Sequence, residues 1–299
     1  MCGIMGYYCF SGKRPQKDKI SDLFSLLQSR GTDASGFAFI KEGGGLIVHK
    51  APIRSSEMVK TKEWKDLSLP KAMILHTRMK TQGTEKNNAN NHPLFSKNGY
   101  AIVHNGIVYN DKEIIGKRNR DAEVDSEAIL SLISIKTKGD NIKRLFDKIE
   151  GSFAVAAVSS SEPNNLMLIK KDNPIQLYYN SEDDIFYFSS ERERMQESLE
   201  IKAETKRGFN MGEGQYHFYE MENNHALILN PEGVESYKRY YPKRSSWWDR
   251  GFGYKPDDTD MIVECPWCFQ QTHYYDGKLF NKCEQCGMGI DEEDLYNVI

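Results

Sequence analysis

Six cysteines are the residues best suited to do chemistry, and they lie in two groups at opposite ends of the chain. Cys2 and Cys9 lie near the N-terminus, and the other four lie between residues 265 and 286 of the 299. The long stretch between the two groups contains no cysteine. This distribution predicts separate functions for the two groups.

The first group contains a candidate nucleophile, Cys2, in the opening stretch MCGIMGYY. Methionine aminopeptidases remove Met1 when the next residue is small, and cysteine qualifies. The exposed α-amino group would titrate at about pH 8 and could act as the general base for the thiol of the same residue. A chance cysteine at this position is the alternative, and other motifs must decide between the two. Cys9 is expected to be buried and inert.

The second group predicts a structural metal site. It has the form C-x2-C, fourteen residues, C-x2-C, so each pair can direct two thiolates into one tetrahedral zinc site. Four cysteine ligands leave no open coordination position, so the zinc would be structural. Free or redox-active thiols and an iron–sulfur centre are the alternatives. The four predicted ligands are Cys265, Cys268, Cys283 and Cys286.

The hydrophobic pattern predicts the elements that would position Cys2. Residues 18–29 form a helix with one apolar stripe, and a second helix runs from about Ser126 to Thr137 with Ser126 as its N-cap. Short apolar runs fill most of the remaining chain up to residue 230, and KEGGG joins two of them in a hairpin. Strand clusters with interspersed helices indicate an α+β or layered domain.

Composition divides the chain into three parts. Residues 2–230 form the α+β domain, residues 231–260 a basic and aromatic linker, and residues 261–299 the four-cysteine segment. The last segment resembles a zinc ribbon, a type of small domain that binds nucleic acid or protein. It is too small to hold a core unaided, so metal ligation would supply its folding energy.

The bulk composition argues against a membrane or secreted protein. The net charge is -3, hydrophobic residues make up 39%, and no apolar run approaches the length of a membrane span. The first residues lack the pattern of a secretion signal, so a cytoplasmic location is expected.

An ordered set of short motifs resembles the glutaminase domain of class II glutamine amidotransferases. The motifs are RGTDASG at 30–36, HTRMKTQG at 76–83, NNHPLF at 90–95, HNGIVYN at 104–110 and VDSEAI at 124–129. The resemblance covers roughly residues 2–230. It implies a four-layer αββα sandwich with two antiparallel sheets, the fold of N-terminal-nucleophile hydrolases, in which the nucleophile begins the first strand.

The resemblance also implies a role for each site residue. Cys2 would attack the side-chain amide carbon of L-glutamine. The side-chain amide of Asn105 and the backbone N–H of Gly106 would form the oxyanion hole. Arg78 would bind the substrate α-carboxylate with its bidentate fork, and Asp125 would bind the α-ammonium group.

Other motif residues receive weaker assignments. Thr81 and Gly83 would contact the substrate, whereas Arg30 and Asp33 would organise the site. Taken without the motif, Arg78 would be a surface ion pair and Asp125 a helix cap. Three histidines are expected to be structural: His76, His92 and His104.

The sequence departs from the family pattern at two positions near the glutamine end of the site. Met79 stands where some members carry an aromatic residue, and Gln82 where some carry histidine. The pocket could therefore close differently, and turnover could be low without a partner.

The residues after 230 show no phosphate-binding loop and leave no room for a second catalytic domain. A stand-alone glutaminase subunit is therefore expected, with its ammonia passing to a separate synthase docked through residues 231–299. The basic and aromatic residues at 237–254 suit protein recognition, packing on the protein's own surface or, less well, single-stranded nucleic acid. An amidohydrolase for another amide and a non-catalytic binding module are the alternative functions.

Overall fold

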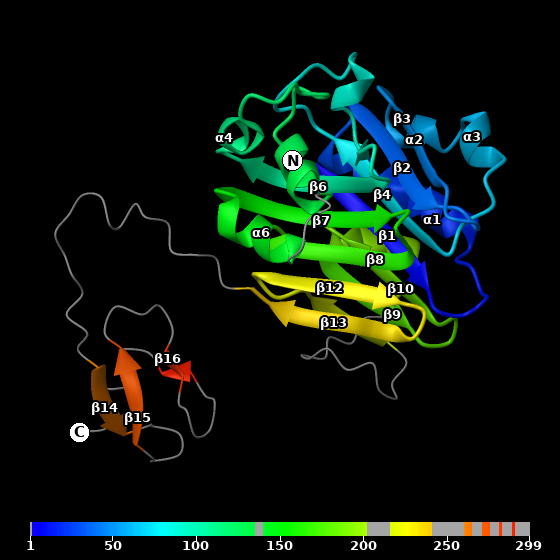
Figure 1. Ribbon diagram of the computed structural model, residues 1–299. Coiled ribbons are helices and arrows are strands. Elements are labelled where there is room, and N and C mark those ends of the chain that lie inside the picture. The colour runs from blue at the N-terminus through cyan, green and yellow to red at the C-terminus, as the bar shows by residue number, and fades with distance from the viewer. Residues whose placement is uncertain are drawn as a thin grey trace. The chain divides into compact units, whose positions relative to one another are not determined.

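The computed structural model describes residues 2–134, 140–201, 216–240, 260–264, 271–275, 281–282 and 289–290 (Figure 1). The chain divides into two compact units, Met1–Lys243 and Arg244–Ile299.

Two antiparallel sheets form the frame of the N-terminal unit, and the first of them carries the N-terminal strand near its middle. Its strand order is β11-β9-β10-β1-β4-β2-β3. Its strands are β1 (Gly3–Cys9), β2 (Ala34–Ile40), β3 (Leu46–Ala51), β4 (Ala72–Arg78), β9 (Gln176–Asn180), β10 (Ile185–Ser189) and β11 (Tyr216–Glu220).

The second sheet has the order β13-β12-β8-β7-β6-β5. Its strands are β5 (Leu94–Phe95), β6 (Tyr100–Val108), β7 (Gly151–Ser159), β8 (Glu162–Lys171), β12 (His225–Asn230) and β13 (Gly233–Arg239). The predicted hairpin around KEGGG is confirmed, because β2 and β3 pair in antiparallel register across it.

Helices cover the outer faces of both sheets (Figure 1). They are α1 (Lys17–Leu26), α2 (Ser55–Met58), α3 (Lys62–Lys65), α4 (Asp111–Ile115), α5 (Ser126–Ile133), α6 (Asn141–Lys148) and α7 (Arg192–Ser198), with 3-10 turns η1 (Leu27–Arg30) and η2 (Asn88–Asn90). The predicted helix over 18–29 is confirmed as α1 continuing into η1. Its apolar stripe is fully buried and consists of Ile20, Leu23, Phe24 and Leu27.

Three separate apolar clusters establish the layering. One lies between α4, α5, α6 and the β5–β8 side of the second sheet, and another lies between α1, α7 and the first sheet. The third fills the space between the two sheets, where Ile4 of β1 and Val103 of β6 are both fully buried. The structure is therefore a four-layer αββα sandwich, as the motif resemblance implied.

The structure corrects two predictions about element boundaries. Helix α5 ends at Ile133, and its N-cap position is Asp125 rather than Ser126, whose side chain instead bonds a histidine. The compact unit also extends past residue 230, because β13 pairs with β12 at the edge of the second sheet. The polar composition of Gly233–Arg239 concealed this edge strand, which has one pairing partner.

In the second unit the described residues form two short antiparallel pairs. Strand β14 (Asp260–Glu264) pairs with β15 (Gln271–Tyr275), and β16 (Asn281–Lys282) pairs with β17 (Gly289–Ile290). The four predicted zinc ligands lie outside the described residues. Among the described helices, none is long and apolar enough to cross a membrane.

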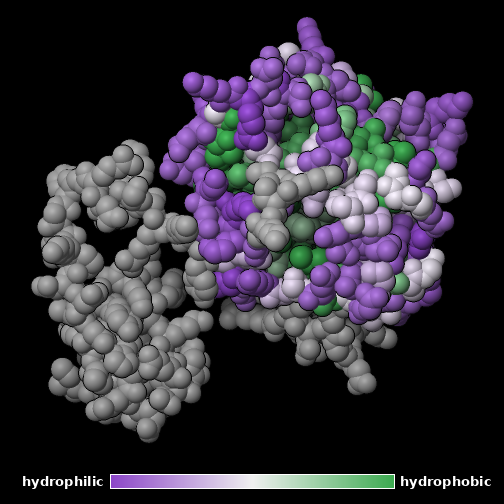
Figure 2. All heavy atoms as spheres, viewed as in Figure 1, coloured by the Kyte–Doolittle hydropathy of each residue, from purple (hydrophilic) through white to green (hydrophobic). Residues whose placement is uncertain are grey.

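Polar residues cover most of the visible face of the N-terminal unit, and apolar residues gather mainly over its upper part in Figure 2. The large apolar side chains that are most exposed include Met79, Phe95, Ile107 and Tyr109.

Helix α1 is held by burial of its apolar stripe, which predicts a clear stability effect. Leu23→Ala should lower the free energy of unfolding by about 2–5 kcal/mol, because it removes buried methyl groups and leaves a cavity. Asp22→Ala, at an exposed position of the same helix, serves as the control. Urea unfolding of the two variants checks this, and equal midpoints would contradict it.

Candidate active site

Cys2 is fixed beside the end of β4 by the register of the first sheet. Gly3 pairs with Thr77, which brings Cys2 to the level of Arg78. The thiol Sγ lies 3.4 Å from the carbonyl oxygen of Met79. Burial raises the pKa of the Cys2 thiol. The thiol therefore stays protonated at neutral pH and needs a base to become a nucleophile.

The backbone around Cys2 is held by contacts distant in sequence. Arg30 donates from Nε to the Cys2 carbonyl oxygen at 3.2 Å, and its Nη1 pairs with Glu191 at 2.5 Å. The N–H of Ile4 donates to Ser190 Oγ at 3.2 Å. A Cβ on Gly3 would lie 2.6 Å from both Leu27 and Thr77, so only glycine permits this close packing. These contacts support the organising role predicted for Arg30.

Arg78 is buried, so the alternative of a surface ion pair is wrong. Its Nη1 donates to Asn91 Oδ1 at 2.8 Å, and its Nη2 donates to the carbonyl oxygens of Gln82 and Gly83 at 2.5 and 3.1 Å. Within the described part of the chain it forms no ion pair with a carboxylate. Burial lowers the pKa of the guanidinium. A buried cation without a counter-ion suits a site that receives a carboxylate.

The loop after β4 carries the two weaker candidates. Gly83 has a φ of 65°, and a Cβ there would lie 2.6 Å from Asn90 Nδ2, so glycine is required at this turn. Thr81 is exposed and forms no hydrogen bond with any described residue. Asp33 supports the start of the loop, because its Oδ2 accepts from the N–H of Lys80 at 2.7 Å. Gly83 therefore shapes the guanidinium site, whereas no side chain or backbone group in the described ranges holds Thr81 by a hydrogen bond.

Asn105 and Gly106 lie on β6, on the other sheet. The side-chain Nδ2 of Asn105 is buried and has no hydrogen-bond partner among the described residues. Gly106 has a φ of 144°, and a Cβ there would lie 2.1 Å from the carbonyl oxygen of Ser152. An unpaired buried amide costs about 1–3 kcal/mol. Such a donor is available to a bound oxyanion.

Asp125 stands at the N-cap position of α5, but its side chain does not act as a helix cap. Its Oδ2 accepts from the N–H of Val108 at 2.7 Å, and its side chain does not cap α5. The carboxylate therefore lies beside Val108, which is the last residue of β6 and follows Gly106 by two positions. Burial has the largest effect on the pKa of the Cys2 thiol, but two nearby charges also act on it. The positive charge of Arg78 lowers this pKa, and the negative charge of Asp125 raises it. The three groups thus share one electrostatic environment.

Three buried histidines connect the sheets behind these residues. His76 Nε2 lies 3.0 Å from the carbonyl oxygen of His104, which joins β4 to β6. His92 stacks on His76 with ring centroids 4.4 Å apart. The rings are buried as expected, but four ring nitrogens have no partner among the described residues: His76 Nδ1, His92 Nδ1, His92 Nε2 and His104 Nε2.

Sequence reasoning missed the role of two residues. Asn91 receives a hydrogen bond from Arg78, and Glu191 holds Arg30. Asn91 lies in the motif NNHPLF, but no residue-level signal distinguishes either residue from ordinary polar residues.

The histidine cluster predicts acid sensitivity. Burial lowers the pKa of His76 to about 3 and also lowers those of His92 and His104. The unfolded chain takes up these protons below about pH 6.5, whereas the folded chain does not. Stability is therefore fully present above that pH and is lost as the pH falls toward about 3, by up to roughly 1.4 kcal/mol per pH unit and histidine.

Urea unfolding at about pH 7 and about pH 5 checks this, since carboxylates change little in that window. His92→Asn should reduce the loss between the two pH values, and His49→Gln, outside the cluster, should retain it. Equal losses of unfolding free energy between about pH 7 and about pH 5 in the two variants would contradict the assignment of this acid sensitivity to the histidine cluster.

Comparisons with known proteins identify a family for part of the chain. Residues 76–197 match the family described as "Glutamine amidotransferase domain". Glutamine–fructose-6-phosphate aminotransferase (isomerizing) of Aquifex aeolicus is 34% identical over 184 residues, which cover 58% of this chain and 30% of that protein. The enzyme of the same name from Clostridium acetobutylicum is 29% identical over 246 residues, covering 79% of this chain and 36% of that protein.

The solved structure of glutamine phosphoribosylpyrophosphate amidotransferase from B. subtilis has the same fold. It superimposes with a TM-score of 0.62 at 20% identity, over 81% of this chain and 50% of that chain. This chain spans about a third of the length of the two aminotransferases that it matches. From the matched family region and the shared αββα fold, we conclude that the chain carries a class II glutamine amidotransferase domain.

Proposed function

We propose that the domain hydrolyses the side-chain amide of glutamine at Cys2 and releases ammonia for an acceptor enzyme. The observation that carries this proposal is the buried Asn105 Nδ2, which has no hydrogen-bond partner among the described residues and lies next to Gly106 with its φ of 144°. Such an arrangement costs stability and is explained if its partner is an oxyanion that forms during the reaction. The residues of the matched family region include both of these positions.

The reaction would proceed through a thioester. The α-amino group of Cys2, freed when Met1 is absent, takes the thiol proton, and the sulfur attacks the amide carbon. The tetrahedral oxyanion is held by the Asn105 amide and the Gly106 N–H. Its collapse breaks the C–N bond, and the protonated amine supplies the proton that leaves with ammonia. Water, activated by the same amine, then hydrolyses the thioester to glutamate and regenerates the thiol.

Two buried charges would select free glutamine over a glutamine side chain within a peptide. The guanidinium of Arg78 has no carboxylate partner in the described residues, so the substrate α-carboxylate can supply the missing negative charge. Asp125 can receive the α-ammonium group with the lone pairs that Val108 leaves unused. A glutamine within a peptide lacks both charges, so it would leave both charged groups buried without a counter-ion.

We further propose that a separate synthase accepts the ammonia and docks at the mouth of this site. Exposed apolar side chains adjoin the site residues in sequence: Met79 follows Arg78, and Ile107 follows Gly106. Tyr109 is 74% exposed on the same segment. Similarity to amidotransferases supports glutamine as a substrate and gives no support to nucleic-acid binding. A cytoplasmic location accords with the free thiols of Cys2 and Cys9.

For the C-terminal unit we propose a structural zinc ion held by Cys265, Cys268, Cys283 and Cys286. Each C-x2-C pair occurs in the segment that follows one strand and precedes its pairing partner: the first pair between β14 and β15, the second between β16 and β17. Two strand pairs, each with two cysteines in the segment that joins its strands, can supply the four thiolates of a closed tetrahedral site.

Replacement of the nucleophile tests the proposed reaction. Cys2→Ala should abolish glutamate formation from glutamine, because no thioester can form. Cys9→Ala, which removes a buried thiol on the same strand, should retain turnover. Intact-mass spectrometry must show Cys2 as the first residue of the active chain. Equal activity in Cys2→Ala and wild type would contradict the proposal, as would full activity with Met1 retained.

Substrate selection by charge predicts the effect of Asp125→Asn. This variant should lower kcat/KM for glutamine by roughly 10–100-fold, because a charge-assisted hydrogen bond is lost. The preference for glutamine over N-acetylglutamine should narrow, since the acetylated substrate carries no ammonium group. Asp147→Asn on α6 is the control. Unchanged discrimination between the two substrates in Asp125→Asn would contradict the role.

Metal analysis tests the second proposal. Purified protein should contain one zinc per chain, and Cys265→Ser together with Cys283→Ser should lose it. Glutamine hydrolysis should persist in this double variant, because the nucleophile belongs to the other unit. A metal-free wild-type protein with four titratable thiols would contradict the zinc assignment.

A further inference from the structure

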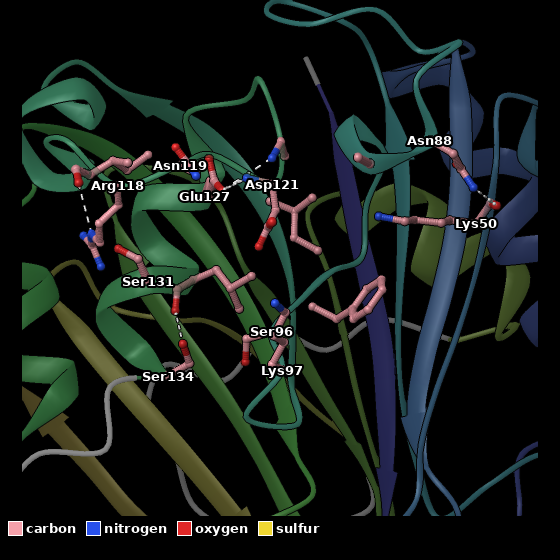
Figure 3. Close-up of a pocket in the computed structure, with 16 residues that line it drawn as sticks. Lys50, Asn88, Ser96, Lys97, Arg118, Asn119, Asp121, Glu127, Ser131 and Ser134 are labelled. Atoms are coloured by element: carbon pink, nitrogen blue, oxygen red, sulfur yellow. Dashed lines mark hydrogen bonds between the residues drawn. The ribbon is translucent and has the colours of Figure 1, made fainter.

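A cavity whose lining does not include Cys2 or Arg78 lies among β3, β5 and α5 (Figure 3). Its volume is about 680 Å³, within the range of small-molecule sites. Leu94, Phe95 and Leu130 contribute apolar surface to its lining. In Figure 3, Lys50 and Asn88 lie on one side, and Ser131 of α5 and Ser134, the residue after its end, lie on the other. The cavity therefore combines an apolar lining with a few polar groups, as ligand sites commonly do.

Lys50 gives this cavity a cation without a counter-ion. Its ammonium group donates to the carbonyl oxygen of Asn91 at 2.6 Å and lies 5.4 Å from the centroid of the Phe95 ring. It forms no ion pair with a carboxylate in the described ranges. Burial lowers the pKa of the Lys50 ammonium group to about 8. A negatively charged ligand would supply the charge that is missing here.

The other charges around the cavity also favour an anion. Lys97 and Arg118 line it, and the Arg118 side chain donates to the backbone carbonyls of Ile114 and Ile115 and pairs with no carboxylate in the described part of the chain. Of the two lining carboxylates, Glu127 is already paired with Arg120 at 3.0 Å. Asp121 is the other. The lining thus carries three cations against one acid that has no ion-pair partner among the described residues.

A short hydrogen-bond path leads from this cavity to Arg78. Asn91 is fully buried and accepts from Lys50 on its backbone carbonyl and from Arg78 on its side chain, at 2.8 Å. Its Nδ2 donates to Asn88 Oδ1 at 3.0 Å, and Asn88 in turn donates to the Lys50 carbonyl at 2.9 Å. A ligand that moves Lys50 or Asn88 must disturb Asn91, which orients the guanidinium.

We propose that this cavity binds a small organic anion, a phosphate or carboxylate on an aromatic or apolar body, and that its occupancy changes glutamine affinity through Asn91 and Arg78. The first half stands on the cavity alone, whereas the second half rests on the proposed glutaminase function. Because coupling between two sites is reciprocal, glutamine must change the affinity of the anion by the same factor.

Calorimetry with 1-naphthyl phosphate on the full chain tests the binding site. We expect saturable binding at one site per chain, with inorganic phosphate and neutral 1-naphthol each binding more weakly. Lys50→Gln, which keeps a donor for Asn91 but removes the charge, should weaken binding roughly tenfold. Lys62→Gln, an exposed lysine of α3 outside the cavity, is the matched control. Circular dichroism and thermal unfolding verify that both variants fold.

The binding outcomes are decisive in either direction. Absence of saturable binding, or equal affinity in Lys50→Gln and Lys62→Gln, would overturn the proposed site. Inorganic phosphate binding as tightly as the naphthyl ester would overturn the role of the apolar lining.

The coupling is tested by the KM for glutamine with and without saturating 1-naphthyl phosphate. A shift in wild type that disappears in Lys50→Gln is expected. If the anion binds but the KM for glutamine does not change, the proposed coupling is overturned, whereas the proposed binding site still stands. Anion binding by a protein that never hydrolyses glutamine would instead contradict the proposed function alone.

Discussion

A nucleophile at the end of a chain must be held by the rest of the molecule, because chain ends are otherwise poorly fixed. Here β1 lies between β4 and β10 near the middle of the first sheet, and it pairs with β4 from Gly3 onward and with β10 from Met5 onward. The ion pair between Arg30 and Glu191 then holds the Cys2 carbonyl. Every other feature of the site depends on this anchoring, since it places the thiol beside Arg78.

The site contains several buried groups that the fold leaves without partners. Asn105 offers an unpaired amide, and Arg78 carries a charge with no carboxylate beside it in the described residues. Such groups lower stability and are retained where a ligand or transition state completes them. Two large apolar clusters outside the sheets and a third between them offset this cost. The groups that lower stability thus lie where we expect binding and catalysis.

The sequence predicted the type of fold and named candidate site residues, but it did not predict the contacts that these residues make. The stripe of α1 follows from apolar spacing, and the αββα layering followed from the motif resemblance. Edge strand β13 was missed because its polar and apolar residues alternate only weakly. The N-cap position of α5 was misplaced by one residue because Asp and Ser are both favoured at helix N-caps. The unpaired state of Asn105 and the path through Asn91 arise from contacts between distant segments, which no local pattern reveals.

The central claim is that the unpaired amide of Asn105 stabilises an oxyanion during attack by Cys2. The most direct measurement is kcat for glutamine hydrolysis by Asn105→Ala, with KM determined in parallel. Our account predicts that kcat falls by roughly 10²–10³-fold. It also predicts that KM changes little, because the donor acts on charge that develops only in the transition state. An unchanged kcat in a folded Asn105→Ala variant would contradict the account.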